Sequence, residues 1–329
     1  MNSQVFEKMK LIVKEYNIVF LDENDIEKCK QEFVDKVKWY NISQYQKLSE
    51  EFIREFSNKV NWKYISICQK LSEEFIREFA DKVSWKYISE YQKLSEEFIR
   101  KFANNVCWSY ISSNQNLSEE FIREFSKKVD WYHISINQKL SEEFIREFAD
   151  KVNWYCISKY QKLSEVFIRE FADRVDWYCI SRYQKLSKEF IKKFKKFKKF
   201  DLTISENNWL YKSKEEKLSY LKENCKDVYE IVDDKYIVAY KSTRVDGSSI
   251  YNFQYQYKVN EVYESHCDCN VDNENSFGLS AWTKEKALEH YSKGKLFKAH
   301  INIEDVGVIV HDNKKIRCSK LTIVSEESF

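Results

Sequence analysis

The sequence predicts a mostly α-helical protein in which an N-terminal α-solenoid of two-helix repeats is followed by a small α+β domain. Three observations support this prediction. A tryptophan returns every 23 residues, the residues around it follow helical spacing, and short strand-like stretches replace this pattern after about residue 200. The recurring tryptophans are Trp39, Trp62, Trp85, Trp108, Trp131, Trp154 and Trp177.

The first 38 residues are expected to cap this array. Residues 3–15 have the pattern of an amphipathic helix, and residues 16–38 read as a degenerate repeat with Tyr16 in place of the tryptophan. Phe33 and Val37 hold the positions of apolar residues in the later repeats. The predicted organisation is a cap over 1–38, seven repeats over 39–200 and the α+β domain over 201–329.

Each repeat reads as two short helices. Trp39, Ile42, Ser43 and Gln46 are spaced at i, i+3, i+4 and i+7, so they share one face of the first helix. A Leu-Ser pair then turns the chain, and Ser49 is expected to cap the second helix. The candidate caps before the tryptophan are Asn61, Ser84, Asp130, Asn153 and Asp176.

The apolar residues of one repeat face too many directions for an isolated helix pair to bury. The second helix carries Phe52, Ile53 and Phe56, and the first adds Trp39. Neighbouring copies must cover these surfaces, which predicts stacked repeats. A continuous coiled coil is the competing interpretation, but the Leu-Ser break in each copy argues against an unbroken heptad seam.

The first helix also has a variable face, formed by the positions one, two, five and six after the tryptophan. Rigid aromatic side chains with a polar tip suit protein interfaces, so this tyrosine-rich face is interpreted as a binding surface. Unconstrained variation at solvent-facing positions is the alternative interpretation. The candidate binding residues are Tyr40, Tyr45, Tyr64, Tyr87, Tyr91, Tyr110, His133, Tyr160 and Tyr183.

Two invariant polar residues lie on the face that is expected to be buried. Because buried polar groups need hydrogen-bond partners, Ser43, Gln46 and their equivalents are predicted to form a ladder between successive repeats. A role in reading a ligand is the alternative.

The end of the array is rich in lysine and phenylalanine. It could bind phosphate backbones or an anionic membrane surface, or it could be a solvated helix whose phenylalanines cap the last repeat. The basic patch consists of Lys192, Lys193, Lys195, Lys196, Lys198 and Lys199. Over the whole chain, 55 basic and 53 acidic residues are interspersed, which argues against nucleic acid as a partner of the repeats.

The C-terminal part alternates short strand-like stretches with two expected helices. The helices cover 214–225 and 283–294, with Thr283 as N-cap of the second. The strand-like stretches are 236–242, 253–259, 296–303, 306–311 and 316–324, and Asp246-Gly247 is expected to form a turn. This pattern predicts a small α+β domain.

One cluster in this domain has the residue types of a zinc site. His266, Cys267 and Cys269 are the candidate metal ligands, with Cys225, His290 or Cys318 to complete the shell. The C-x-C spacing departs from the commoner C-x2-C pairs, so ordinary loop and core cysteines are the favoured interpretation. The main expectation is therefore no cofactor, with zinc as the alternative.

The segment ENSFGLSAWT (274–283) places a glycine between aromatic residues beside a helix start, which suits the wall of a pocket. No nucleophile–base–orienter set can be assembled around it, because nothing in the spacing pairs Ser276 or Ser280 with His266 or His290. The sequence gives no catalytic residue and leans away from an enzyme.

Composition points to a reducing intracellular compartment. The nine cysteines are scattered, and Cys156 and Cys179 share a repeat register that places them about 8–10 Å apart, too far for a disulfide. No apolar run approaches the roughly 20 residues of a membrane span, and the N-terminus lacks the layout of a signal peptide.

The repeat motif W-x-x-I-S-x-x-Q-x-L-S-E-E-F-I-R-E-F, from residue 39 to about 194, resembles the tandem-repeat proteins of giant DNA viruses of the mimivirus type. The segments YESHCDCNVDNENSFGLSAWTKEKAL and EDVGVIVHDNKKIRCSKLTIV are similar to a small domain of unknown function at the ends of viral repeat proteins. The resemblance implies a viral protein in the cytoplasm of a protist host and brings no catalytic residue.

These observations favour a protein–protein interaction scaffold that binds an unidentified partner protein through the variable face, and the resemblance makes a host protein a candidate partner. One alternative is a C-terminal enzyme or small-ligand module that the repeats deliver to a target. The other is a tether to nucleic acid or membrane through the basic patch.

Overall fold

The structure is a computed structural model that describes residues 3–20, 25–194, 208–250, 255–291 and 293–327. Its backbone forms two compact units, Met1–Gln115 and Asn116–Phe329, and each is described by itself. The division falls inside the repeat array and not at residue 200, so the last repeats and the α+β domain belong to one unit.

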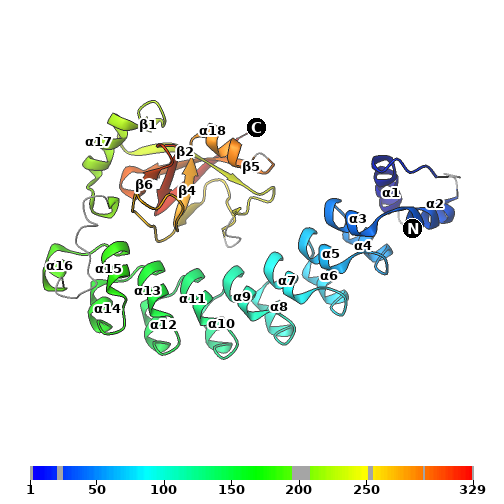
Figure 1. Ribbon diagram of the computed structural model, residues 1–329, viewed down its shortest axis with the longest axis horizontal. Helices are drawn as coiled ribbons and strands as arrows, with labels where there is room; N and C mark the ends of the chain where they lie inside the picture. Colours follow the sequence, from blue (N-terminus) through cyan, green and yellow to red (C-terminus); the bar gives the residue numbers. More distant parts are fainter. Residues whose placement is uncertain (1–2, 21–24, 195–207, 251–254, 292, 328–329) are drawn as a thin grey trace. The chain divides into compact units, whose positions relative to one another are not determined.

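Pairs of short helices recur every 23 residues in both units (Figure 1), which confirms the prediction of helical repeats. We call the helix that begins at each repeat tryptophan the Trp helix and its successor the Glu helix. The first unit contains α1 (Ser3–Glu15), α2 (Ile26–Lys36), the Trp helices α3 (Trp39–Tyr45), α5 (Trp62–Cys68), α7 (Trp85–Tyr91) and α9 (Trp108–Asn114), and the Glu helices α4 (Glu50–Glu55), α6 (Glu73–Glu78) and α8 (Glu96–Lys101). The second unit contains the Glu helices α10 (Glu119–Glu124), α12 (Glu142–Glu147), α14 (Glu165–Glu170) and α16 (Lys188–Phe194), and the Trp helices α11 (Trp131–Asn137), α13 (Trp154–Tyr160) and α15 (Trp177–Tyr183).

Side-chain caps start these short helices. Ser49 Oγ accepts a hydrogen bond from the backbone N–H of Phe52, and a serine does the same at the later Glu helices through α14. Asn61, Asp130, Asn153 and Asp176 cap their Trp helices, as expected. The expectation for Ser84 was wrong, because its side chain makes no cap bond.

Each Trp helix packs on its own Glu helix through aromatic rings. The ring centroids of Trp62 and Phe79 lie 4.9 Å apart, and Phe75 beneath them is fully buried. The half-buried indole of Trp62 donates to the carbonyl oxygen of Ser57, 2.9 Å away, so its polar nitrogen is also satisfied. The same arrangement recurs at Trp85, Trp131 and Trp154.

The predicted polar ladder between successive repeats is confirmed. The side-chain amide of Gln69 donates to the carbonyl oxygens of Ser43 and Gln46, and its Oε1 accepts from the N–H of Leu48. Ser43 Oγ donates to Trp39 O and accepts from the N–H of Asn61 in the next repeat. The ladder therefore runs from side chain to backbone, which satisfies carbonyls and amides that the short helices leave open.

Helices α1 and α2 cover the first repeat. Gln46, which has no earlier repeat to bind, instead donates to Glu15 Oε2 and accepts from Lys8 Nζ. Phe33 is fully buried, with its ring centroid 5.6 Å from that of Trp39, and Val37 is also buried. These contacts agree with a capping role for the first 38 residues.

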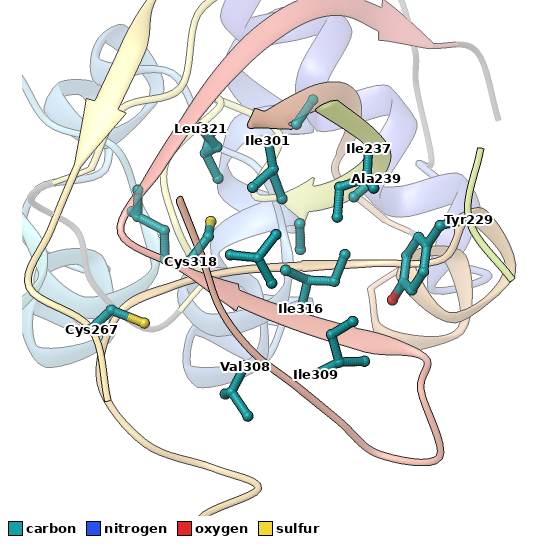
Figure 2. Packing of buried hydrophobic residues seen from close by; sticks show 14 of the residues in the cluster. Tyr229, Ile237, Ala239, Cys267, Ile301, Val308, Ile309, Ile316, Cys318 and Leu321 are labelled. Atoms are coloured by element: carbon teal, nitrogen blue, oxygen red, sulfur yellow. The ribbon is translucent and has the colours of Figure 1, made fainter. Parts of the chain in front are cut away.

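The α+β part of the second unit is an antiparallel sheet of strand order β3-β8-β5-β2-β4-β7-β6, with β1 paired to β2. The strands are β1 (Ile231–Val232), β2 (Tyr236–Thr243), β3 (Val262–Glu264), β4 (Leu279–Trp282), β5 (Lys295–Asn302), β6 (Val306–Val310), β7 (Lys315–Cys318) and β8 (Lys320–Glu327). The helices are α17 (Lys214–Asn224) and α18 (Lys284–His290), with short 3-10 turns η2 (Trp209–Tyr211) and η3 (Ile303–Asp305). Figure 2 shows the apolar core, in which Ile301, Ile316 and Leu321 are almost fully buried.

Several boundaries in this domain differ from the prediction. The expected strand over 316–324 is two strands, because Ser319 forms a corner and its N–H donates to Asp305 O. The described part of 253–259 forms no strand beyond one bridge. A strand that was not expected, β4, is formed by four residues of the segment expected to line a pocket. Helix α18 ends at His290, where the next residue, Tyr291, is extended. Gly294 is therefore not the helix terminus and instead lies directly against the backbone of Thr243.

Within the described residues, no helix has the length and apolar character needed to cross a bilayer.

Candidate functional site

In the first unit, the variable face of the Trp helices is a row of alternating aromatic rings and cations. The hydroxyls of Tyr40 and Tyr64 lie 2.8 Å apart. The ammonium group of Lys63 lies 5.7 Å from the ring centroids of both Tyr64 and Tyr87. One repeat later, the ammonium group of Lys86 lies in the same way near the rings of Tyr87 and Tyr110. These rings are therefore held in place by their neighbours, as the surface of a binding site requires.

Two tyrosines of this face project into solvent at the sixth position after the tryptophan. Tyr45 is 69% exposed and Tyr91 is 39% exposed. Aromatic residues such as tyrosine are enriched in the buried cores of protein interfaces.

In the second unit, part of the same face is covered by the chain itself. Tyr160 and Tyr183 also occupy the sixth position, and the ring of Phe277 packs on both, with centroids 4.9 and 5.5 Å away. Tyr183 is only 7% exposed. The sequence did not predict that two of its candidate binding residues meet the segment that it assigned to a pocket wall.

Charged side chains of β3 and of the repeats also lie close to one another in the second unit. Glu264 of β3 forms an ion pair with Lys320, which lowers the pKa of Glu264. Lys139 and Lys162 of the repeats lie near enough to lower it further. Lys139 and Lys162 directly follow the ladder glutamines, at positions that Lys47, Lys70 and Lys93 hold in the first unit.

The remaining candidates of the repeats lie apart from this contact. His133 packs beside Tyr132, and its buried Nδ1 has no hydrogen-bond partner within the described part of the chain. Lys192 and Lys193 are exposed in the last turn of α16. Lys195, Lys196, Lys198 and Lys199 lie outside the described residues, so the basic patch stays a prediction.

The candidate zinc ligands His266, Cys267 and Cys269 make separate contacts. The thiols of Cys267 and Cys269 are buried and donate to the carbonyl oxygens of Asp268 and Cys267, respectively. The interaction between the two thiols raises the pKa of Cys267 and lowers that of Cys269. The ring of His266 packs instead on Phe277, 5.5 Å away. Among the described residues there is no group of three or more His, Cys, Asp or Glu side chains placed to hold a metal ion.

Both thiols lie over Gly307. A Cβ atom at this glycine would be 2.4 Å from Cys267 Sγ and 3.4 Å from Cys269 Sγ, so only glycine allows this packing. Behind them the fully buried Arg317 donates to the carbonyl oxygens of Asp268, Asn270 and Asn273. Arg317 therefore holds the loop in shape, and its charge is engaged by carbonyl oxygens.

A cavity of about 1170 Å³ opens beside this loop in the second unit. Residues 275–280 and Trp282 line it, which confirms that the segment ENSFGLSAWT forms a pocket wall. His266 also lines it, and burial, with Lys162 nearby, lowers the pKa of His266 to about 4. Its Nε2 is buried and has no hydrogen-bond partner among the described residues.

Three basic side chains that the sequence analysis did not single out as a group line the same cavity. They are Lys241 of β2, Lys315 of β7 and His290 of α18. Lys241 donates to Ser280 O and lies 4.8 Å from the ring centroid of Tyr257. Lys315 donates to Asn275 Oδ1 and lies 4.9 Å from the centroid of Trp282.

Burial perturbs the titration of all three groups. It lowers the pKa of Lys241 to about 8, with a further contribution from Lys315. It also lowers the pKa values of Lys315 and His290, and both lysines add to the effect on His290. Only the sheet pairing brings these residues together, so no local sequence signal could have found them.

Comparison with known proteins adds no function to this geometry. No protein-family model, no curated protein and no solved structure matches the chain.

Proposed function

We propose that the repeats form a solenoid scaffold that binds a partner protein through the variable face of the Trp helices. One observation carries the proposal, the packing of Phe277 on Tyr160 and Tyr183 of consecutive repeats. It supports the view that this face accepts an aromatic side chain at the sixth position after the tryptophan.

The same position is open in the first unit. Tyr45 and Tyr91 are exposed there, and Lys47 and Lys93 follow two residues later at the positions of the lysines near Glu264. The partner segment that suits this surface carries an aromatic residue close to an acidic one. Aromatic anchors of this kind supply much of the binding energy of interfaces.

The chain provides its own probe for this proposal. A peptide of residues 270–280, NVDNENSFGLS, contains Phe277 and two acidic residues. We expect it to bind the full chain, and its Phe277→Ala form to bind at least about tenfold more weakly, because an aromatic anchor is worth about 1–3 kcal/mol.

Substitutions in the full chain locate the binding surface. The double variant Tyr45→Ser, Tyr91→Ser should lose the peptide, whereas Val166→Ser, at a 66% exposed position of the Glu helix α14, should not. Equal binding by both variants, measured by calorimetry, would reject the variable face as the binding surface.

The resemblance to giant-virus repeat proteins extends the proposal to a partner from the host. Capture of one host protein by the wild-type chain and not by the double variant would support that origin of the partner.

A further inference from the structure

The cavity of the second unit has a second property, independent of the scaffold function. Two of its lysines, Lys241 and Lys315, have only neutral hydrogen-bond acceptors among the described residues. In the part of the chain that the structure describes, no carboxylate forms an ion pair with Lys241 or Lys315, and both donate only to neutral oxygens. Lys315 is only 6% exposed.

Two other buried cations of the domain each donate to several backbone carbonyl oxygens, as expected of a purely structural role. Arg317 donates to three carbonyl oxygens, and Lys217 donates to the carbonyl oxygens of Glu304 and Val306. Lys315 donates to two neutral oxygens, Glu274 O and Asn275 Oδ1, whereas Lys241 makes one such bond, to Ser280 O. Its ammonium group therefore retains donor capacity on the side of the cavity.

The arrangement costs stability as it stands. Removing an ammonium group from water costs several kcal/mol, and carbonyl dipoles return only part of that. Lys241 and Lys315 also repel one another and His290, as their lowered pKa values show. A bound anion would supply the missing negative charge and additional hydrogen-bond acceptors.

We propose that Lys241, Lys315 and His290 form a binding site for the phosphate group of a small molecule. Two ammonium groups balance a phosphate dianion, and the imidazole of His290 lines the same cavity. The three side chains come from β2, β7 and α18 and line one cavity. The aromatic rings of Tyr257 and Trp282 hold the two lysines in position.

The cavity is large enough for more than the phosphate group. Its volume of about 1170 Å³ exceeds that of a phosphate ion many times over, and pockets for small molecules reach roughly 1,000 Å³. His266, with its unpartnered Nε2, lines the same space and offers a polar contact to the rest of the ligand.

Thermal unfolding of the full chain in inorganic phosphate, pyrophosphate, acetate and sodium chloride at matched ionic strength tests the site. We expect phosphate and pyrophosphate to raise the midpoint and the other two salts not to, because a ligand that binds only the folded state stabilises it. An equal effect of acetate would overturn the assignment to phosphate, and the absence of any phosphate effect would overturn the site.

Single variants separate binding from structure. Lys241→Met and Lys315→Met keep the length of the side chain, remove the charge and should each weaken phosphate binding about tenfold or more. Because each removes a cation without a counter-charge, both should unfold at an equal or higher temperature without phosphate. The exposed Lys293→Met is the matched control and should leave both quantities unchanged.

Persistence of the phosphate effect in Lys241→Met and Lys315→Met would overturn the proposal. A labelling measurement on the wild-type chain does not depend on variants that fold. We expect phosphate to slow the reaction of an amine-specific reagent with Lys241 and Lys315 but not with Lys293, as followed by mass spectrometry. Equal slowing at all three lysines, or at none, would contradict the site.

Discussion

The side-chain amide of Gln69 donates to the backbone carbonyl of Gln46, 2.8 Å away, and thereby joins each repeat to the one before it. The same bond links Gln92 to Gln69 and Gln184 to Gln161. Because the acceptor is the backbone, this bond needs the glutamine side chain of one repeat and no particular side chain in the repeat before it.

Removal of one such glutamine should destabilise the array. Gln92→Leu leaves the N–H of Leu71 and the carbonyl oxygens of Ser66 and Gln69 buried without their partner. We expect the free energy of unfolding to fall by about 1–3 kcal/mol, as for other unsatisfied buried groups. Urea denaturation measures this, and the exposed neighbour Lys93→Ala is the control. A loss no greater than that of the control would mean that the ladder contributes nothing to stability.

The sequence could predict this ladder because the signal is repeated and local. Ser43 and Gln46 lie on the buried face at helical spacing in every copy, and a buried amide needs partners. The prediction did not specify backbone acceptors, since these depend on how closely successive Trp helices approach.

Phe277→Ala should release the loop before β4 from the repeats of the second unit. The ring contacts with Tyr160 and Tyr183 would be lost, at a cost of about 1 kcal/mol beyond the apolar area exposed. Hydrogen exchange of residues 266–280 should then accelerate roughly fivefold or more. The exposed Asp272→Ala is the control. If the two variants exchange at the same rate, Phe277 does not anchor the loop.

A methyl group at Gly307 should disrupt the packing of the C-x-C segment. The new Cβ would lie 2.4 Å from Cys267 Sγ, so Gly307→Ala should lower the free energy of unfolding by about 1–3 kcal/mol. Adding Cys267→Ala removes the clashing sulfur and should restore part of that loss. A double-mutant cycle measures the coupling, and strictly additive losses would show that the two groups do not touch.

The lowered pKa of Lys241, about 8 against a usual 10.5, makes stability depend on pH in a definite direction. Between these values the unfolded chain binds more protons than the folded one, so stability gains from Lys241 as pH rises from 8 to 10.5. The wild-type chain should therefore gain about 1–2 kcal/mol relative to Lys241→Met over this range, allowing for partial exposure.

The comparison with Lys241→Met is needed because other groups near Lys241 titrate in the opposite sense. Burial raises the pKa of Cys318 to about 12 and raises that of Tyr257, so both oppose stability at alkaline pH. Lys315 and His290 also face Lys241. These contributions largely cancel in the difference between the two proteins. A pH-independent difference would show that Lys241 has an ordinary pKa.

The cavity residues could not have been predicted from the sequence, for a physical reason. Lys241, His290 and Lys315 are adjacent only because β4 lies between β2 and β7 in the sheet. Strand β4 has four residues, and β7 and β8 follow one another as a single strand-like stretch that changes pairing partners at Ser319. Alternation of apolar residues reports the presence of a strand but not its neighbours.

The place where an aromatic ligand contacts the repeats tests the proposed function most directly. The peptide NVDNENSFGLS, with photoreactive benzoylphenylalanine in place of the residue corresponding to Phe277, can be cross-linked to the full chain and the attachment points sequenced. Our account predicts attachment on the Trp helices α3 and α7, at or beside Tyr45 and Tyr91. Attachment confined to the Glu helices α4, α6 and α8 would contradict it.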